Sequence, residues 1–137
     1  MKRFQAIEKA IQERWAGDPA AGMCCAILDY AVSKPDETSV MLTFGDFSKL
    51  TGASFDQEEL QRAIAILVSR YSALEMRLIF FDEKDGPLYL DKEEQSDFVK
   101  TGTLAHPHSG EIVQDAKDRI FPYYIAQPQA LLEEVRR

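Results

Sequence analysis

The stretch TFGDFSKLTGASFDQEELQRAIAILVSRYSALEMRLIF, residues 43–80, decides the fold. It contains two helix-start signals. Thr43 is a residue type that caps helices, and Asp46 stands three positions further on. Asp56 and Glu59 repeat this spacing. Both pairs match the pattern of a capping box, in which each side chain satisfies a free backbone N–H of the first turn. Two helices are therefore predicted within this stretch.

The same stretch also indicates where these helices end. Gly52 suits a C-terminal cap, which predicts a short helix over residues 43–51. A continuous apolar stripe then predicts a longer helix over residues 56–72. After Ala73 the apolar residues alternate with others, so the spacing predicts a strand over residues 74–81.

Outward from this stretch, the pattern predicts further helices and a hairpin. Apolar residues at helical spacing predict helices over residues 3–16 and 20–33, and a short strand follows at 40–42. Residues 82–86 are turn-rich and predict a hairpin over 74–91. Three shorter helical segments complete the prediction. The first runs from Asp91, capped with Glu94, to near Lys100, and the second is a helical turn at 115–121 ended by Pro122. In the third, Pro128 suits the first helical position and residues 130–135 finish the chain as a helix.

Composition predicts a globular α+β protein that is mostly helical. The chain has 137 residues, of which 45% are hydrophobic and 28% charged, and this length fits a single domain over residues 1–137. Its longest uncharged apolar run is too short to cross a bilayer. We see no pattern of a secretory signal peptide, so we expect a cytoplasmic protein without a membrane partner.

The order of elements over residues 20–91 resembles the winged-helix superfamily, a helix-turn-helix variant. We expect that span to form a winged-helix-like core and residues 92–137 to form an extension that packs on it. The resemblance implies DNA binding, with residues 56–72 as the reading helix and 82–86 as the wing. Under that alternative the protein is a transcriptional regulator acting as a dimer, and its DNA-contacting bases are Lys49, Arg62 and Arg70.

The charge distribution disfavours DNA as the partner. The net charge is -7, and the reading helix would begin with the acids Asp56, Glu58 and Glu59. Such a surface repels phosphates. We therefore predict a small, acidic, non-enzymatic adaptor or regulatory subunit that binds another protein, with a homodimer as a further arrangement. Its acidic partner-binding candidates are Asp82, Glu83, Asp85, Glu93 and Glu94.

A dense aromatic segment near the C-terminus has two interpretations. Phe121, Tyr123 and Tyr124 can strap the tail across the helical core, or they can form a surface for a partner. Tyrosine is enriched at interfaces because it offers contact area at a low entropic cost. We include these three residues among the partner-binding candidates.

Few residues suggest catalysis, a metal or a cofactor. His106 and His108 flank Pro107, and either form a solvated turn or bind a metal with Asp115 or Glu111. Cys24 and Cys25 are adjacent on a helix, which suits buried thiols better than a disulfide. The sequence contains none of the nucleophile, phosphate-loop or zinc-protease motifs that we sought. We expect no catalytic residues, no cofactor and no metal ligands.

Overall fold

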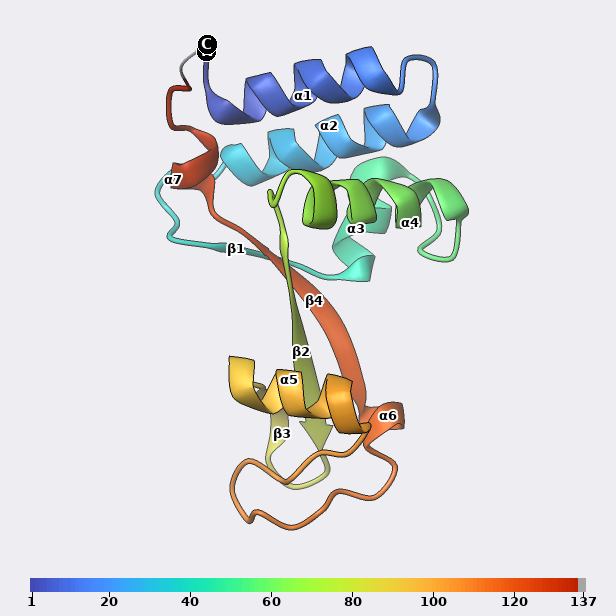
Figure 1. Cartoon of the computed structure of the whole chain (residues 1–137), viewed down its shortest axis with the longest axis vertical. Helices are drawn as coiled ribbons and strands as arrows, with labels where there is room; N and C mark the ends of the chain where they lie inside the picture. The colour runs from blue at the N-terminus through green and yellow to red at the C-terminus, as the bar shows by residue number, and fades with distance from the viewer. Residues whose placement is uncertain (136–137) are drawn as a thin grey trace. The chain divides into compact units, whose positions relative to one another are not determined.

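The computed structural model describes residues 1–135 and is α+β, mostly helical, as predicted. Within this range 48% of the chain is helical, and a four-stranded antiparallel sheet has the strand order β1-β4-β2-β3 (Figure 1). The elements are α1 (Arg3–Arg14), α2 (Pro19–Val32), β1 (Val40–Leu42), α3 (Phe44–Thr51), α4 (Glu58–Ala65), the π-helix Ile66–Arg70, β2 (Glu75–Asp82), β3 (Gly86–Tyr89), α5 (Lys92–Thr101), α6 (Ala116–Arg119), β4 (Ile120–Ala126) and α7 (Pro128–Leu131).

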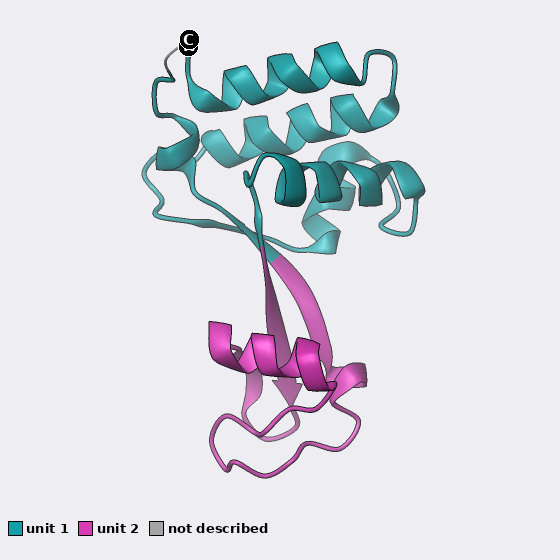
Figure 2. Ribbon diagram, in the orientation of Figure 1, with its two compact units in different colours: residues 1–75, 124–137 teal, residues 76–123 magenta. Residues whose placement is uncertain are grey.

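The chain divides into two compact units (Figure 2). Unit 1 comprises Met1–Glu75 and Tyr124–Arg137, and unit 2 comprises Met76–Tyr123. In this division the hairpin groups with the residues that follow it, up to Tyr123. The single domain with a core over residues 20–91 stays a prediction. The winged-helix resemblance stays a prediction.

Unit 1 is built around a helical core. Asp18 caps α2 by accepting a hydrogen bond from the backbone N–H of Ala20, and Pro19 occupies the first helical turn, where its missing N–H costs nothing. Side chains of α1, α2, α3 and α4 bury a large cluster that includes Ile11, Ile27 and Leu67. Burial of these apolar surfaces is the main source of this unit's stability.

The first predicted helix start is confirmed, and the second is wrong. Thr43 and Asp46 form the capping box of α3, and Gly52 ends the helix with a left-handed φ of 74°. At the second start the Asp56 carboxylate accepts a hydrogen bond from Ser54 Oγ at 2.5 Å, so Gln57 is the N-cap instead.

The second helix is also shorter than predicted. Regular α-helix ends at Ala65, and a π-helix runs from Ile66 to Arg70. Its widened turn is shown by the Tyr71 N–H, which donates to the Ile66 carbonyl five residues back. An apolar stripe cannot distinguish these two helix types, since both keep Ile66 and Leu67 on the buried side.

Unit 2 contains a hairpin covered on one face by a helix. β2 and β3 pair with Ile79 opposite Tyr89 and Phe81 opposite Pro87. Leu78 and Phe80, on the other face of β2, form a small core with residues that follow the hairpin. The buried members of this core are Leu78, Phe80, Leu90, Leu104, Ala116 and Ile120. α5 lies beside the hairpin (Figure 1), and its Phe98 packs against this small core.

The N-terminal cap and the end of α5 are confirmed. Asp91 and Glu94 form its capping box, and Gly102 ends it with a φ of 74°. In addition, the Gln95 side chain accepts from the Leu78 N–H and donates to the Met76 carbonyl, which ties α5 to β2.

The largest error of the sequence analysis is strand β4, which was not predicted, whereas the helical turn predicted over residues 115–121 is present as α6. The sequence predicts that Pro122 ends that turn, and proline is also disfavoured inside a strand because it cannot donate to the ladder. In the structure β4 pairs with β1 at Tyr124–Ala126, and Pro122 lies outside that ladder. On its other side β4 neighbours β2 in the sheet. The last helix begins at Pro128, which confirms the first helical position predicted for this proline, but it ends at Leu131 and not at residue 135.

Candidate functional site

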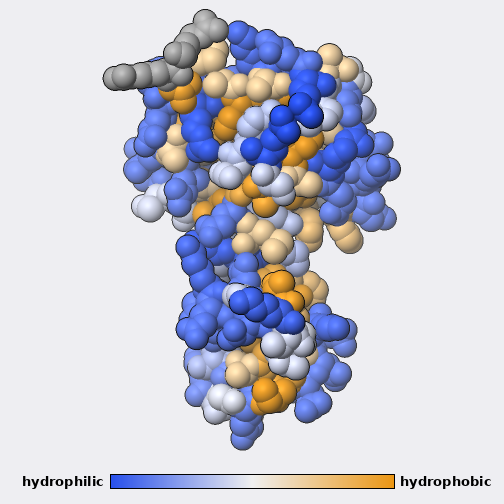
Figure 3. Space-filling model, in the orientation of Figure 1, coloured by the Kyte–Doolittle hydropathy of each residue, from blue (hydrophilic) through white to orange (hydrophobic). Residues whose placement is uncertain are grey.

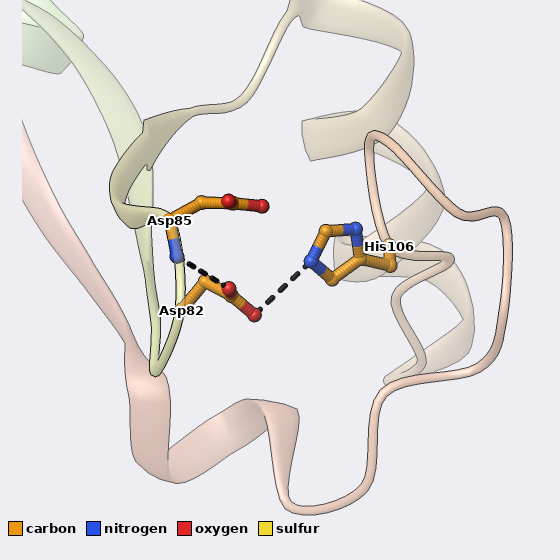
Figure 4. Close-up of side chains that lie close together, drawn as sticks. All are labelled: Asp82, Asp85 and His106. Carbon is orange, nitrogen blue, oxygen red and sulfur yellow. Dashed lines mark hydrogen bonds and ion pairs between the residues drawn. The ribbon is translucent and has the colours of Figure 1, made fainter.

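The turn between β2 and β3 meets the loop that follows α5 in a cluster of carboxylates and imidazoles. His106 Nε2 lies 3.0 Å from Asp82 Oδ1, and His108 Nδ1 lies 3.1 Å from Asp85 Oδ2. One ligand-type atom from each of Asp82, Asp85 and His106 lies within 4.8 Å of the other two (Figure 4). The histidines lie more than twenty positions after the two aspartates in the chain, so the fold of unit 2 brings them together.

Backbone groups hold Asp82 in place. Its Oδ2 accepts hydrogen bonds from the N–H groups of Asp85 at 2.8 Å and Lys84 at 3.0 Å, which closes the tight turn. The hydrogen bond from Asp85 lowers the pKa of Asp82 most, with further contributions from Lys84 and His106 that outweigh desolvation. Oδ1 remains directed at His106, so this carboxylate is ionised and aimed before any ligand binds.

The ring of His106 is also oriented by its surroundings. Its Nδ1 accepts from the backbone N–H groups of His108 at 3.1 Å and Ser109 at 3.3 Å. Nδ1 therefore carries no proton in the neutral ring, and Nε2–H donates to Asp82. The ring packs edge-on against Phe80 at 5.9 Å, and the side chains of His106 and Asp82 are only 15% and 13% exposed.

The outer pair is more open. The side chains of His108 and Asp85 are 63% and 43% exposed. Beside them lies an open pocket of about 430 Å³ that is also lined by Lys84, Ser109 and Glu111. Ligands of small size can reach the cluster from this side.

The loop that carries the histidines is closed by its own backbone. Ala105 bridges Ile112, the His106 N–H donates to the Glu111 carbonyl at 2.7 Å, and Gly110 adopts a left-handed φ of 75°. A residue with a Cβ is strained at that φ, so glycine permits this turn. The two histidines are thus presented from a hydrogen-bonded loop.

A second feature of unit 2 is an aromatic sheet face, defined here as Phe81, Tyr89 and Phe121. Residues two apart on a strand, and residues opposite one another on paired strands, share a face. Phe81 and Tyr89 therefore lie on the face of Ile79, away from Phe80 and α5. Phe121 joins them, because its ring packs edge-on against Phe81 at 5.7 Å.

The predicted partner-binding residues do not form one surface. Glu83 lies in the β2–β3 turn and pairs with Arg119 at 2.7 Å. Glu93 and Glu94 lie in the first turn of α5, which covers the face opposite the aromatic one, and Glu94 is occupied in the capping box. Asp82 and Asp85 belong to the histidine cluster.

The three aromatic candidates are also separated by burial. Phe121 is exposed, whereas Tyr123 and Tyr124 are buried. The Tyr124 ring packs against Phe47 at 5.4 Å in unit 1, and the Tyr123 ring contacts Tyr89 at 5.5 Å in unit 2. The strapping interpretation therefore describes Tyr124, and an open surface is available at Phe121.

The bases assigned to DNA contact have mixed surroundings. Arg62 is held by the Asp18 carboxylate at 2.5 Å and lies near Glu58. Arg70 stacks over the rings of Trp15 and Tyr71. Lys49 is exposed on α3. Arg62 is thus partly neutralised, which weakens the phosphate-binding set that the winged-helix resemblance implies.

The sequence analysis proposed Asp115 or Glu111 as companions of the histidines and missed Asp82 and Asp85. The sequence analysis places both acids in a turn and among the partner-binding candidates, but not beside the histidines. A signal was present, since two turns rich in metal-binding residue types follow one another in the sequence, but no periodic pattern pairs two turns.

Two further observations bear on the class of protein. Cys24 and Cys25 are free thiols, and burial raises the pKa of Cys24 to about 12, which makes this thiol inert at neutral pH. In residues 1–135 no helix combines the length and apolar character needed to cross a membrane.

Comparison of the chain with protein-family models, with curated proteins and with solved structures finds no match.

Proposed function

We propose that this protein is a non-enzymatic interaction module, a regulatory or adaptor subunit, that docks a basic and partly apolar segment of another protein on unit 2. One observation carries the proposal, the exposure of three large rings from three strands on one sheet face. Tyr89, Phe121 and Phe81 are 57%, 50% and 45% exposed.

Exposed aromatic residues in one patch are unusual for a surface without a partner. Single exposed apolar residues are common, but a contiguous patch marks an interaction site. Phe81 and Phe121 already contact one another, so they present a preordered surface that loses little side-chain entropy on binding. Aromatic anchors of this kind supply much of the binding energy at protein interfaces.

Charge indicates which partner the surface fits. Residues 76–123 contain ten acidic and six basic residues, a net charge of -4, and Glu83 in the adjoining turn is exposed. A basic segment would gain from this potential in both encounter rate and specificity. A second copy of this chain fits less well, because each copy carries a net charge of -7. The face of the molecule drawn in Figure 3 is mostly hydrophilic, with smaller hydrophobic areas among the polar residues.

The test is a selection of random displayed peptides on the full-length protein, followed by affinity measurements on the enriched sequences. We expect these peptides to be basic and to contain apolar residues. Phe81→Ser and Phe121→Ser should each weaken their binding about tenfold or more, the cost typical of an interface anchor. The matched control is Val99→Ser, which changes an even more exposed apolar residue on α5, away from the aromatic sheet face.

Three outcomes would contradict the proposal. The enriched peptides could be acidic, both Phe variants could bind them as the wild type does, or Val99→Ser could weaken binding as much as they do. Circular dichroism of each variant separates lost docking from lost folding.

A further inference from the structure

We propose that the cluster of unit 2 is a binding site for a divalent transition-metal ion, with Zn²⁺ as the ion it suits best. The ligands would be Asp82 Oδ1, Asp85 Oδ2, His106 Nε2 and His108 Nδ1. The inference is independent of the proposed docking function, since it uses none of the residues of the aromatic sheet face.

The geometry is close to that of a four-coordinate site. Zn²⁺ lies about 2.0–2.2 Å from nitrogen and oxygen ligands in a tetrahedral arrangement, which places the ligand atoms themselves about 3.4 Å apart. In the structure the two closest ligand pairs are 3.0 Å and 3.1 Å apart, and those of Asp82, Asp85 and His106 all fall within 4.8 Å. Small side-chain rotations bring three of the ligands to bonding distance, and the exposed ring of His108 is free to follow.

The ligand types indicate the class of metal. Imidazole favours zinc and its neighbours in the first transition row, whereas calcium and magnesium prefer sites made of oxygen alone. Two carboxylates and two neutral imidazoles carry a total charge of -2, which matches a divalent cation. The backbone N–H groups on Asp82 Oδ2 supply the outer support that orients a ligating carboxylate.

Metal binding requires one rearrangement that can be observed. A metal on His106 Nε2 displaces the proton from this atom, and the neutral ring must then carry its proton on Nδ1. Nδ1 can no longer accept from the N–H groups of His108 and Ser109, so these two hydrogen bonds must break. The segment is exposed at both residues, which leaves it room to move.

A metal would also meet a structural need of unit 2. This unit has 48 residues and a core of few buried side chains. Small units with little core are the ones in which a bound metal most often supplies folding stability. The cluster joins the β2–β3 turn to the loop after α5, where a crosslink would restrain the open end of the unit.

The experiment is calorimetric titration of the full-length, tag-free protein with ZnSO₄, after treatment with a chelator. We expect one site per chain. Asp82→Asn and His106→Ala should each weaken Zn²⁺ binding by more than the roughly 10–100-fold that loss of an outer-shell partner causes. His108→Ala should also weaken it, and this exposed side chain can be removed without disturbing the core.

Two control variants report binding elsewhere. Asp97→Asn removes an exposed carboxylate of α5 that does not line the pocket, and Cys25→Ser removes the more accessible thiol. Both should bind Zn²⁺ as the wild type does. Amide NMR should show the His108 and Ser109 resonances shifting at one equivalent of Zn²⁺, because their hydrogen bonds to His106 are lost.

The proposal is overturned if the wild type gives no saturable Zn²⁺ binding, or if the ligand variants and the control variants bind equally. It is also overturned if His108→Ala keeps full affinity while the amide resonances of the loop stay unchanged. In those cases the cluster is a pair of His–Asp hydrogen bonds that closes the loop. Peptide docking on the aromatic sheet face would be unaffected by either result.

Discussion

Units 1 and 2 use the same local devices but differ in what lies beneath them. α3 in unit 1 and α5 in unit 2 both begin with a capping box and both end at a left-handed glycine. Beneath α3 lies a large helical core, and Phe47 is fully buried in it. α5 itself has no fully buried residue and covers a small core.

This difference shows where the two units obtain their stability. Burial of apolar surface scales with the number of core residues, so unit 1 is secured by its core. Unit 2 has less to bury and adds polar contacts that link distant segments, namely Asp82 with His106, Asp85 with His108, and Glu83 with Arg119. The histidine–carboxylate contacts therefore lie in the unit with the smaller core, while unit 1 has the Asp18–Arg62 pair as a polar contact between distant segments.

The largest expected effect on stability follows from removal of the two fully buried phenylalanine rings, one in each unit. Phe47→Ala in unit 1 and Phe80→Ala in unit 2 each remove a side chain that is 0% exposed, at a cost of about 3–5 kcal/mol in the free energy of unfolding. This cost approaches the whole reserve that a small core supplies. We expect amide hydrogen exchange to lose protection throughout residues 76–123 in Phe80→Ala, but only partly in unit 1 for Phe47→Ala.

Val99→Ala is the control for both variants, since it shortens an exposed side chain and should change the free energy of unfolding by less than about 0.5 kcal/mol. Equal residual protection in the two units would show that the smaller core is not the weaker one.

The sequence predicted those parts of both units that are set by local chemistry. The capping box of Thr43 and Asp46, that of Asp91 and Glu94, and the hairpin all follow from residues a few positions apart. Strand β4 was not predicted, because its partner strands β1 and β2 lie far away in the sequence, and strand pairing at that range is a tertiary property.

Only the histidines of the candidate site could be predicted from the sequence, for the same reason. His106 and His108 stood out as a pair, but their partners come from a turn more than twenty residues earlier. The Asp56 start failed on a smaller scale, since the competing hydrogen bond from Ser54 leaves the position of the cap to Gln57.

A medium effect is expected at the matched helix starts. Thr43→Ala in α3 and Asp91→Ala in α5 each remove a side chain that accepts from the backbone N–H three residues on. Loss of such a cap costs about 1 kcal/mol, within a range of roughly 0.5–2 kcal/mol. Denaturant unfolding measures the cost, and amide exchange locates it.

The comparison is sharpened if Asp91→Ala opens the whole of unit 2 while Thr43→Ala opens only the first turn of α3. The structurally conservative controls are Thr43→Ser and Asp91→Asn, which keep a capping oxygen and should recover most of the loss. Failure of both controls would mean that the caps act through something other than this hydrogen bond.

The smallest expected effect concerns pH and belongs to unit 1 alone. Glu8 on α1 has its pKa raised to about 8, first by desolvation and then by the neighbouring Asp29 carboxyl, with which the protonated form shares a hydrogen bond. Oε2 of Glu8 is buried and accepts no hydrogen bond within residues 1–135, so burial disfavours its charge. In the unfolded chain the pKa returns to its ordinary value of 4.5.

The sign of the effect follows from this difference. Below pH 4.5 Glu8 is protonated in both the folded and the unfolded chain, and its full contribution to stability is present. Between pH 4.5 and 8 the unfolded chain releases the Glu8 proton while the folded chain keeps it, so stability falls as pH rises. Glu8→Gln keeps the size of the side chain and removes the charge. After a discount for solvent screening, we expect it to raise the free energy of unfolding by about 0.5–1 kcal/mol at pH 9 and to leave it unchanged at pH 4.

Denaturant unfolding followed by the fluorescence of Trp15, which packs against the core of unit 1, measures this difference across the pH range. Glu13→Gln, a change on the exposed side of the same helix, should leave the pH profile as it is. In unit 2 the lowered pKa of Asp82 has the opposite sign, so its contribution is lost when pH falls. Glu8→Gln should therefore flatten the alkaline side of the unit 1 profile without changing amide protection in residues 76–123. A wild-type profile that rises from pH 5 to 8 would show that the carboxyl pair does not oppose folding.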